Sequence, residues 1–191
     1  MKKIDIKTTI PYDKLTKSQR TLVVLCGHNG LRYAVDFDEI DEVLSQVVDF
    51  DFCYIDKEQS PTTPLHAACD NDNINLVAKL LEHGATADIL VFDSQNSLKN
   101  GTTPLWELQY PLSIADESQN EERNVEANIR LKIAELLLDY GANPMETISG
   151  TESLFEYVNY KYYYEKDESD YWYIEKFYEQ LQKYAKKYND I

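Results

Sequence analysis

The chain has 191 residues, of which 43% are hydrophobic and 12% aromatic, and its formal net charge at pH 7 is −15. This length and composition favour a folded protein, either one domain or an elongated array of a few stacked units. The negative charge argues against nucleic acid and anionic membranes as partners, because both attract clustered Lys and Arg. It favours a basic partner, or it simply keeps the protein soluble.

Three cysteines, Cys26, Cys53 and Cys69, are widely spaced and form no metal-ligand pattern. An odd number of such cysteines is typical of a reducing compartment. The basic N-terminal residues have no apolar stretch behind them, and the apolar run over 22–26 is too short for a signal peptide or a membrane span. We therefore expect a cytoplasmic protein, while secretion through a folded-state or C-terminal signal stays open.

The first 60 residues predict an arm, a helix and a weakly marked repeat. Isoleucines alternate with polar residues over 4–10, which indicates a short strand or an ordered arm. Residues 13–26 predict a helix that ends before Gly27. A degenerate repeat start follows at 27–34, and a second helix carries an apolar stripe. That stripe consists of Ile40, Val43, Leu44, Val47 and Val48.

Residues 60–88 contain the most regular pattern in the chain. Thr63 followed by Pro64 is a typical helix start, because a hydroxyl caps the free amides and the proline ring fixes φ at the first helical position. A short apolar helix and a polar turn at 70–73 follow. Apolar residues then recur at helical spacing over 74–81, and Gly84 is placed to end this second helix.

This pattern resembles the ankyrin repeat. The family's TPLH-x-A signature matches residues 63–68, and its later LL-x-x-GA signature matches residues 80–85, in the right order and without a gap. The resemblance implies paired helices that stack on neighbouring repeats and a function in protein binding. It also implies that His66 forms hydrogen bonds that tie neighbouring loops together, rather than acting in catalysis.

The third repeat departs from the usual spacing. Residues 101–105 restate the helix start 40 residues after Pro64, against a period of 33, so seven extra residues lie in the preceding connection. Trp106 stands where the motif has His. The partner helix ends at Gly141, and its distance from Gly84 indicates an acidic insertion of about 17 residues at roughly 110–128.

A fourth unit begins at 150–158, where Ser153 stands in the place of the motif's proline. A polar, tyrosine-rich excursion is expected at 159–170, followed by a terminal helix at 171–188. The expected inward stripe of that helix is Ile174, Phe177, Tyr178, Leu181 and Ala185.

We therefore expect an all-α fold: an ankyrin-repeat solenoid of the bacterial type, with short finger loops, about four helix-turn-helix repeats and degenerate ends. An N-terminal arm and capping helix would occupy residues 1–26, and the repeat domain residues 27–188. Its approximate repeats are 27–55, 56–88, 89–144 with the insertion, and 145–188, which forms a C-terminal cap with a second insertion.

Patterns that carry chemistry are mostly missing from the sequence. No phosphate-binding loop, dinucleotide-binding motif or nucleophile motif occurs. The Asp-Asn-Asp-Asn stretch at 70–73 fails as a calcium loop, because Ile74 and Asn75 occupy positions five and six. We expect no enzyme activity, no cofactor and no metal site.

Two surface features favour contact with another protein. Nine acidic residues and one basic residue lie between Asp36 and Glu58, and in ankyrin-like stacks the fingers and first helices line the concave binding face. Ten of the 15 tyrosines lie from Tyr157 onward, and aromatic side chains with polar tips are enriched at interfaces. The ordinary alternatives are a solvated helix face and the core of the last repeat. The candidate interaction residues are Asp36, Asp38, Asp56, Glu58, Asp70, Trp106, Tyr110, Tyr160, Tyr162, Tyr163 and Tyr164.

The function that we expect is non-catalytic protein binding, with a partner that has a basic surface and with a monomer in the unbound state. A narrower hypothesis is an acidic inhibitor or immunity protein that blocks a basic toxin or enzyme. One alternative is a secreted effector that docks on a host protein. A second is an enzyme that uses the insertion as a lid.

Overall fold

The computed structural model describes residues 1–27, 37–55, 60–92, 101–109, 121–147, 152–166 and 171–189. Its α-helices are α1 (Lys17–Cys26), α2 (Phe37–Ser45), α3 (Pro64–Asp70), α4 (Ile74–Glu82), α5 (Glu121–Asp139), α6 (Leu154–Tyr164) and α7 (Tyr171–Asn189). The short 3-10 helices are η1 (Ile6–Thr8), η2 (Tyr12–Lys14) and η3 (Trp106–Gln109). The strands are β1 (Lys3–Asp5), β2 (Tyr54–Ile55), β3 (Pro61–Thr62) and β4 (Leu90–Phe92).

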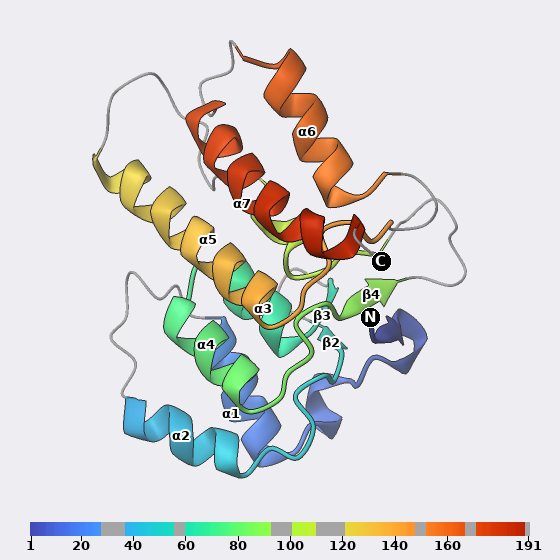
Figure 1. Cartoon of the computed structure of the whole chain (residues 1–191). Coiled ribbons are helices and arrows are strands. Elements are labelled where there is room, and N and C mark those ends of the chain that lie inside the picture. The colour runs from blue at the N-terminus through green and yellow to red at the C-terminus, as the bar shows by residue number, and fades with distance from the viewer. Residues whose placement is uncertain are drawn as a thin grey trace.

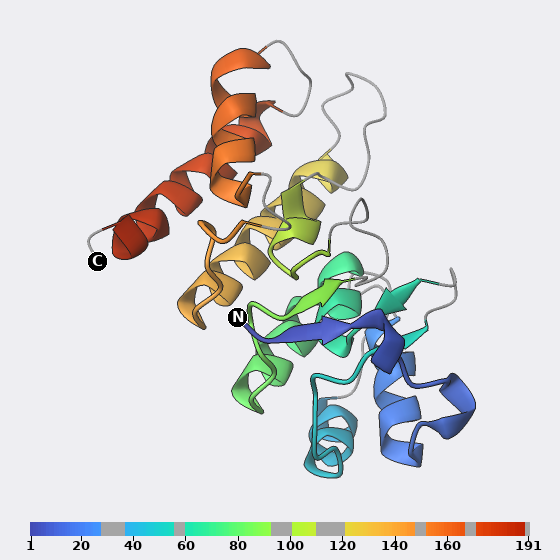
Figure 2. The same cartoon turned by 90° about the vertical axis from the view of Figure 1, so that its right-hand side faces the viewer.

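The helices lie in two parallel rows (Figure 1 and Figure 2). In the first row α1 contacts α3, α3 contacts η3, and η3 contacts α6. In the second row α2 contacts α4, α4 contacts α5, and α5 contacts α7. Each first-row element also packs on the second-row helix that follows it in the chain. Four helical pairs are therefore stacked side by side in the described part of the chain.

Each first-row element starts with the same kind of cap. The hydroxyl groups of Thr16, Thr63 and Ser153 accept the backbone N–H of the residue three positions later. Thr103 does the same before η3, where its hydroxyl accepts from Trp106 N at 3.3 Å. A hydroxyl at this position satisfies an amide that the helix leaves free, so the four starts share one physical cause.

Two predicted helix starts are wrong by a few residues because of these caps. The helix predicted at 13–26 begins at Lys17, since Thr16 and Gln19 form a reciprocal capping box, and Tyr12–Lys14 forms η2 instead. Ser153 likewise caps α6 together with Glu156, so it precedes the helix and does not occupy the first helical position. Both helices therefore start where a side chain can hold the first free amides.

The first unit also differs from the sequence-based picture. The predicted capping helix is α1, and it packs on both α2 and α3, as the other first-row elements pack on their neighbours. The degenerate repeat start at 27–34 lies, apart from Gly27, outside the described residues. Helix α2 ends at Ser45, so Val48, predicted to be part of its apolar stripe, is 99% exposed.

The tyrosine-rich stretch after Val158 is helical rather than an irregular excursion. Helix α6 continues to Tyr164, and Tyr162 stacks on Tyr178 of α7 with ring centroids 4.4 Å apart. Helix α5 begins at Glu121, so the last part of the predicted insertion belongs to that helix, and residues 110–120 lie outside the described part. Packing between α6 and α7 accounts for the longer helix.

The connections between pairs form narrow antiparallel contacts. Strand β2 pairs with β3, and isolated bridges join Val91 to Thr102 and Thr147 to Ser153. Strand β1 pairs in parallel with β4, which lies in the connection between the second and third pairs. Ile10 forms a bridge with Tyr54, which lies in the connection between the first and second pairs. The arm predicted from alternating isoleucines is therefore partly a strand, and it crosses two of the connections (Figure 2).

The core lies between the two rows and is apolar. Each pair contributes fully buried side chains. They are Leu22 and Leu44 from the first pair, Leu65 and Leu80 from the second, Leu137 from the third and Phe177 from the fourth. All five residues of the stripe predicted for α7 are buried. Each pair packs its apolar side against the next pair. The stack therefore buries apolar surface that a single pair of short helices would leave in contact with water.

The backbone at Gly101 leaves no room for a side chain. A Cβ atom there would lie 2.2 Å from the carbonyl oxygen of Val91 and 2.8 Å from Leu90 Cδ1. We expect Gly101→Ala to lower the free energy of unfolding by about 1–3 kcal/mol, as in other overpacked sites, because the Val91–Thr102 bridge must open.

Gly27→Ala is the matched control for this prediction. A Cβ at Gly27 would make only ordinary contacts, at 3.5 and 3.7 Å from two carbonyl oxygens of α1. Denaturant titration of both variants measures the difference. A Gly101→Ala protein as stable as Gly27→Ala would contradict the crowding inferred here.

Candidate functional site

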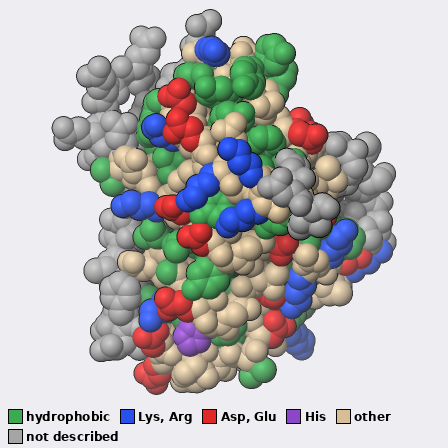
Figure 3. Space-filling view, viewed as in Figure 1, with side chains coloured by type: hydrophobic (Ala, Val, Ile, Leu, Met, Phe, Trp, Pro, Cys, Tyr) green, Lys and Arg blue, Asp and Glu red, His purple; other side chains and the backbone are tan. Residues whose placement is uncertain are grey.

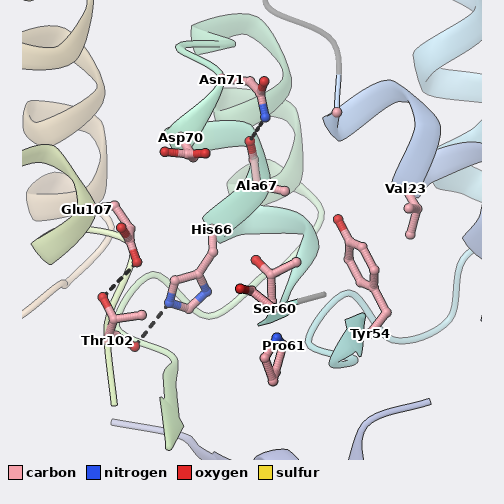
Figure 4. A pocket seen from close by; sticks show the side chains of 12 residues that line it. Val23, Tyr54, Ser60, Pro61, His66, Ala67, Asp70, Asn71, Thr102 and Glu107 are labelled. Carbon is pink, nitrogen blue, oxygen red and sulfur yellow. Dashed lines mark hydrogen bonds between the residues drawn. The ribbon is translucent and has the colours of Figure 1, made fainter. Parts of the chain in front are cut away.

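A pocket of about 480 Å³ lies between the first row and two of the connections. Its walls come from α1, the β2–β3 hairpin, α3 and the segment that leads into η3. Figure 4 shows two carboxylates, Asp70 and Glu107, on one side of this pocket, with Tyr54 and Val23 on the other. We call the space between the first row and these connections the groove.

The acidic side of the pocket is held in place by hydrogen bonds. The Thr102 hydroxyl donates to Glu107 Oε1 at 2.8 Å, and burial raises the pKa of the Glu107 carboxyl. Asp70 is exposed at the C-terminal end of α3. Among the described residues that line the pocket there is no Lys or Arg. The pocket therefore presents oxygen acceptors and negative charge, which suit a cationic group.

His66 lines the pocket, is buried, and ties two connections together. Its Nδ1 lies 2.8 Å from the Thr63 hydroxyl, and its Nε2 lies 3.1 Å from the carbonyl oxygen of Thr102. Burial lowers the pKa of His66 to about 4, so the ring is neutral near pH 7. The Nε2–H then donates to Thr102, and the Thr63 hydroxyl donates to Nδ1. Both ring nitrogens are used structurally, as the family resemblance implies.

Arg130 of α5 supports the acidic side from the second row. Its Nε lies 2.9 Å from Asp72 Oδ1, and both side chains are buried, with 3% and 0% exposed. Its guanidinium also reaches the carbonyl oxygens of Glu107, at 3.3 Å, and Asp70, at 3.5 Å. One buried cation therefore holds the backbone beneath both acids of the pocket.

Asp72 occupies a position of unusual backbone geometry. It has φ of 53°, in the left-handed region that glycine adopts more readily than other residues. Burial raises the pKa of the Asp72 carboxyl to about 6, and the Arg130 charge opposes this effect. The Asp72 carboxylate at this turn is paired with Arg130, and nothing in the residue spacing predicted that Arg130 would be buried.

Of the four predicted tyrosines on α6, Tyr162 is partly buried, whereas Tyr160, Tyr163 and Tyr164 are exposed. Tyr162 stacks on Tyr178, and Tyr163 lies edge-on to the same ring at 6.2 Å. Tyr160 and Tyr164 face each other with centroids 4.9 Å apart, and they are 54% and 74% exposed. Dense packing on α7 thus uses part of the cluster, and part of it remains in contact with solvent.

Trp106 is half-buried in the first row and contacts Tyr157 of α6, with ring centroids 5.8 Å apart. It joins the third and fourth units where His66 joins the second and third. Its role as an interaction residue stays a prediction, and this packing leaves only part of the side chain accessible.

The equivalent caps place three side chains in register along the first row. Val23, Asp70 and Tyr160 each lie seven residues after the N-cap of their helix. Val23 and Asp70 both line the pocket. Tyr160 therefore continues the same line into the fourth unit. The predicted repeat starts did not show this relation, because they placed Ser153 at the first helical position and not at the N-cap.

The other predicted interaction residues cannot be placed in this site. Asp36, Asp56, Glu58 and Tyr110 lie outside the described residues, and so does the side chain of Asp38. These five remain predictions.

The described residues offer little for catalysis or metal binding. No group of three or more His, Cys, Asp or Glu is close enough there to hold a metal ion. Cys26, Cys53 and Cys69 are free and buried, and burial raises the pKa of each thiol, which disfavours the reactive thiolate. Within the same residues no helix is long and apolar enough to cross a membrane.

The stacked pairs define the class of a helical repeat protein. Residues 62–94 match the family model described as Ankyrin repeat, which spans α3, α4 and β4. The chain therefore contains an ankyrin repeat over these residues. Comparison with curated proteins and with solved structures found no match.

Proposed function

We propose that this protein binds a basic segment of another protein in its groove and performs no catalysis itself. The pocket carries the proposal. It is lined by Asp70 and Glu107, the described lining residues include no Lys or Arg, and it opens between first-row helices and connections. Ankyrin repeats are interaction modules, and their presence supports protein binding as the general function. The acidic lining supports a Lys-rich or Arg-rich partner.

The proposal includes the arrangement of the whole chain. We infer a solenoid of four units, in which the N-terminal arm precedes α1, α1 is the first helix of the first unit, and the later units are divided at about 55, 88 and 144. The two rows of helices support this division. Asp36, Asp38, Asp56 and Glu58 would extend the negative groove toward the first unit, and the protein would be a monomer when unbound.

A narrower form of the proposal is an inhibitor or immunity-type protein in the cytoplasm that covers the basic surface of a toxin or enzyme. The net charge of −15 supports it, because complementary charge speeds the encounter of two proteins. A secreted effector that docks on a host protein is the alternative. An enzyme that uses residues 110–128 as a lid is a third reading, which would require perturbed acids or a metal in a cleft.

Site-specific photocrosslinking tests which surface is used. A photoreactive amino acid at Asn71, which lines the pocket, should capture a protein with a basic surface from the cells of origin or from host cells. Capture should fall as salt is raised, because screening weakens charge attraction. Comparing the two cell sources separates the inhibitor from the effector.

Lys132 is the matched control position, since it is exposed on α5 in the second row. A photoreactive group there should not capture the same protein. Equal capture from both positions, or capture from Asn71 that does not depend on salt, would contradict groove binding.

A further inference from the structure

Tyr160 and Tyr164 form an exposed aromatic pair at the far end of the first row. Their rings lie 4.9 Å apart at an interplanar angle of 31°, and the side chains are 54% and 74% exposed. The face of the molecule in Figure 3 also shows hydrophobic side chains gathered over α6. Two large rings held in solvent by the same helix are an unusual use of aromatic surface.

The packing of α6 determines which way this pair points. Helix α6 meets α7 through Phe155 and Tyr162, which both stack on Tyr178, and it meets η3 through Tyr157. At 100° per residue, Tyr160 and Tyr164 lie on the side of α6 opposite to α7. That side corresponds to the groove side of α3, because Tyr160 is equivalent to Asp70 relative to the caps.

The charges beside the pair are suited to a cation. Glu156 is exposed one turn before Tyr160, and hydrogen bonds from the backbone N–H and then the hydroxyl of Ser153 hold the pKa of its carboxyl below the usual range. Lys161 is only 14% exposed, and its Nζ lies 2.6 Å from Glu165 Oε2. Because its charge is paired in this way, it repels an incoming cation only weakly. The exposed lysines of α7 lie on the other row, over which basic side chains gather in Figure 3.

We propose that Tyr160 and Tyr164 bind a second arginine of the basic segment whose first cationic side chain occupies the pocket beside Asp70 and Glu107. The inference rests on the proposed groove function and adds the partner's chemistry. A guanidinium stacks on aromatic faces and is attracted by their electron-rich centres, and it is less strongly hydrated than the ammonium group of lysine. The aromatic pair therefore favours arginine at this point.

The spacing of the two arginines follows from the stack. Asp70 and Tyr160 are two units apart, and neighbouring packed helices are about 8–10 Å apart, so the sites are separated by roughly 20 Å. An extended chain advances about 3.3 Å per residue. Two arginines separated by five residues would therefore span the distance.

Synthetic 14-residue peptides in a Gly-Ser-Ala background provide the test. One peptide has a single arginine, a second has two arginines separated by five residues, a third has two separated by two residues, and a fourth carries citrulline in place of the second arginine of the five-residue spacing. NMR titration measures each dissociation constant. The five-residue spacing should bind about tenfold more tightly than the other three peptides, in the range of a partly desolvated cation–aromatic contact.

Paired variants distinguish ring chemistry from general packing. The Tyr160→Leu and Tyr164→Leu double variant should lose the tenfold gain, while the corresponding double Phe variant, which keeps both ring faces, should retain it. Both positions are exposed, and thermal unfolding verifies that each variant is folded. Equal affinity of the four peptides, or a gain that survives in the Leu variant, overturns this inference and leaves the pocket proposal intact. No binding by any peptide overturns the groove function itself.

Discussion

Arg130→Met is expected to lower the free energy of unfolding by about 3–5 kcal/mol at pH 8, because it leaves the Asp72 carboxylate buried without its cation. Methionine preserves much of the volume, so the loss reflects charge rather than a cavity. The substitution also removes the contacts of the guanidinium with the carbonyl oxygens of Asp70 and Glu107. Urea denaturation measures the change.

A second substitution separates the ion pair from the packing. Asp72→Gly combined with Arg130→Met removes both charges and places glycine where φ is 53°, so most of the lost stability should return. In Arg130→Met alone, the pKa of Asp72 should rise further above 6, so acid should favour the folded state by supplying the missing proton. A double variant as unstable as the single one would show that the buried charge is not the cause.

Acidification from pH 8 to pH 4 is expected to remove about 3 kcal/mol of stability through His66, by the linkage between proton binding and folding. Burial lowers the pKa of His66 in the folded protein to about 4, against 6.5 for an ordinary histidine. The unfolded state therefore binds the proton first. The contribution is fully present above pH 6.5 and is lost as the pH falls toward 4.

His66→Gln is the control, since glutamine keeps hydrogen-bonding capacity but does not titrate in this range. Asp72 acts in the opposite direction, because its raised pKa makes the folded state bind a proton more readily than the unfolded state between pH 6 and pH 3.8. Its effect is common to both proteins and cancels in the difference between their stability curves. Curves that remain parallel between pH 6.5 and pH 4 would contradict the assignment to His66.

The central repeat could be predicted because its local signals agree with its packing. Thr63 and Pro64 start α3, and Gly84, with φ of 94°, follows the end of α4 where the left-handed conformation is needed. The hydrogen bonds of His66 also follow the family pattern. Such signals depend on a few neighbouring residues, and the sequence contains all of them.

The fourth unit was harder to predict because two local signals compete. Aligning 150–154 with 101–105 places Ser153 on the motif's proline, whereas the capping box with Glu156 moves the helix start by one residue. The S-x-x-E spacing was the available signal. The extension of α6 to Tyr164 depends on contacts with α7, and these are not visible in the local pattern.

The burial of Arg130 and the formation of the acidic pocket depend on contacts between units. The first part of α5 is rich in charged residues, so an arginine there is expected to face water. It is buried because Asp72 supplies a countercharge at a turn of the preceding unit. The polar turn at 70–73 contains this aspartate, but its local sequence does not specify the partner.

The dissociation constant of the crosslinked partner, measured over a range of salt concentrations, tests groove binding most directly. Asp70→Asn combined with Glu107→Gln should weaken binding by about 100-fold, in the range reported for paired interfacial charges, and should flatten the salt dependence. Glu82→Gln combined with Glu135→Gln removes two exposed acids of the second row and should change the affinity less than twofold. Equal effects of the two pairs, or no effect of either, would contradict the account.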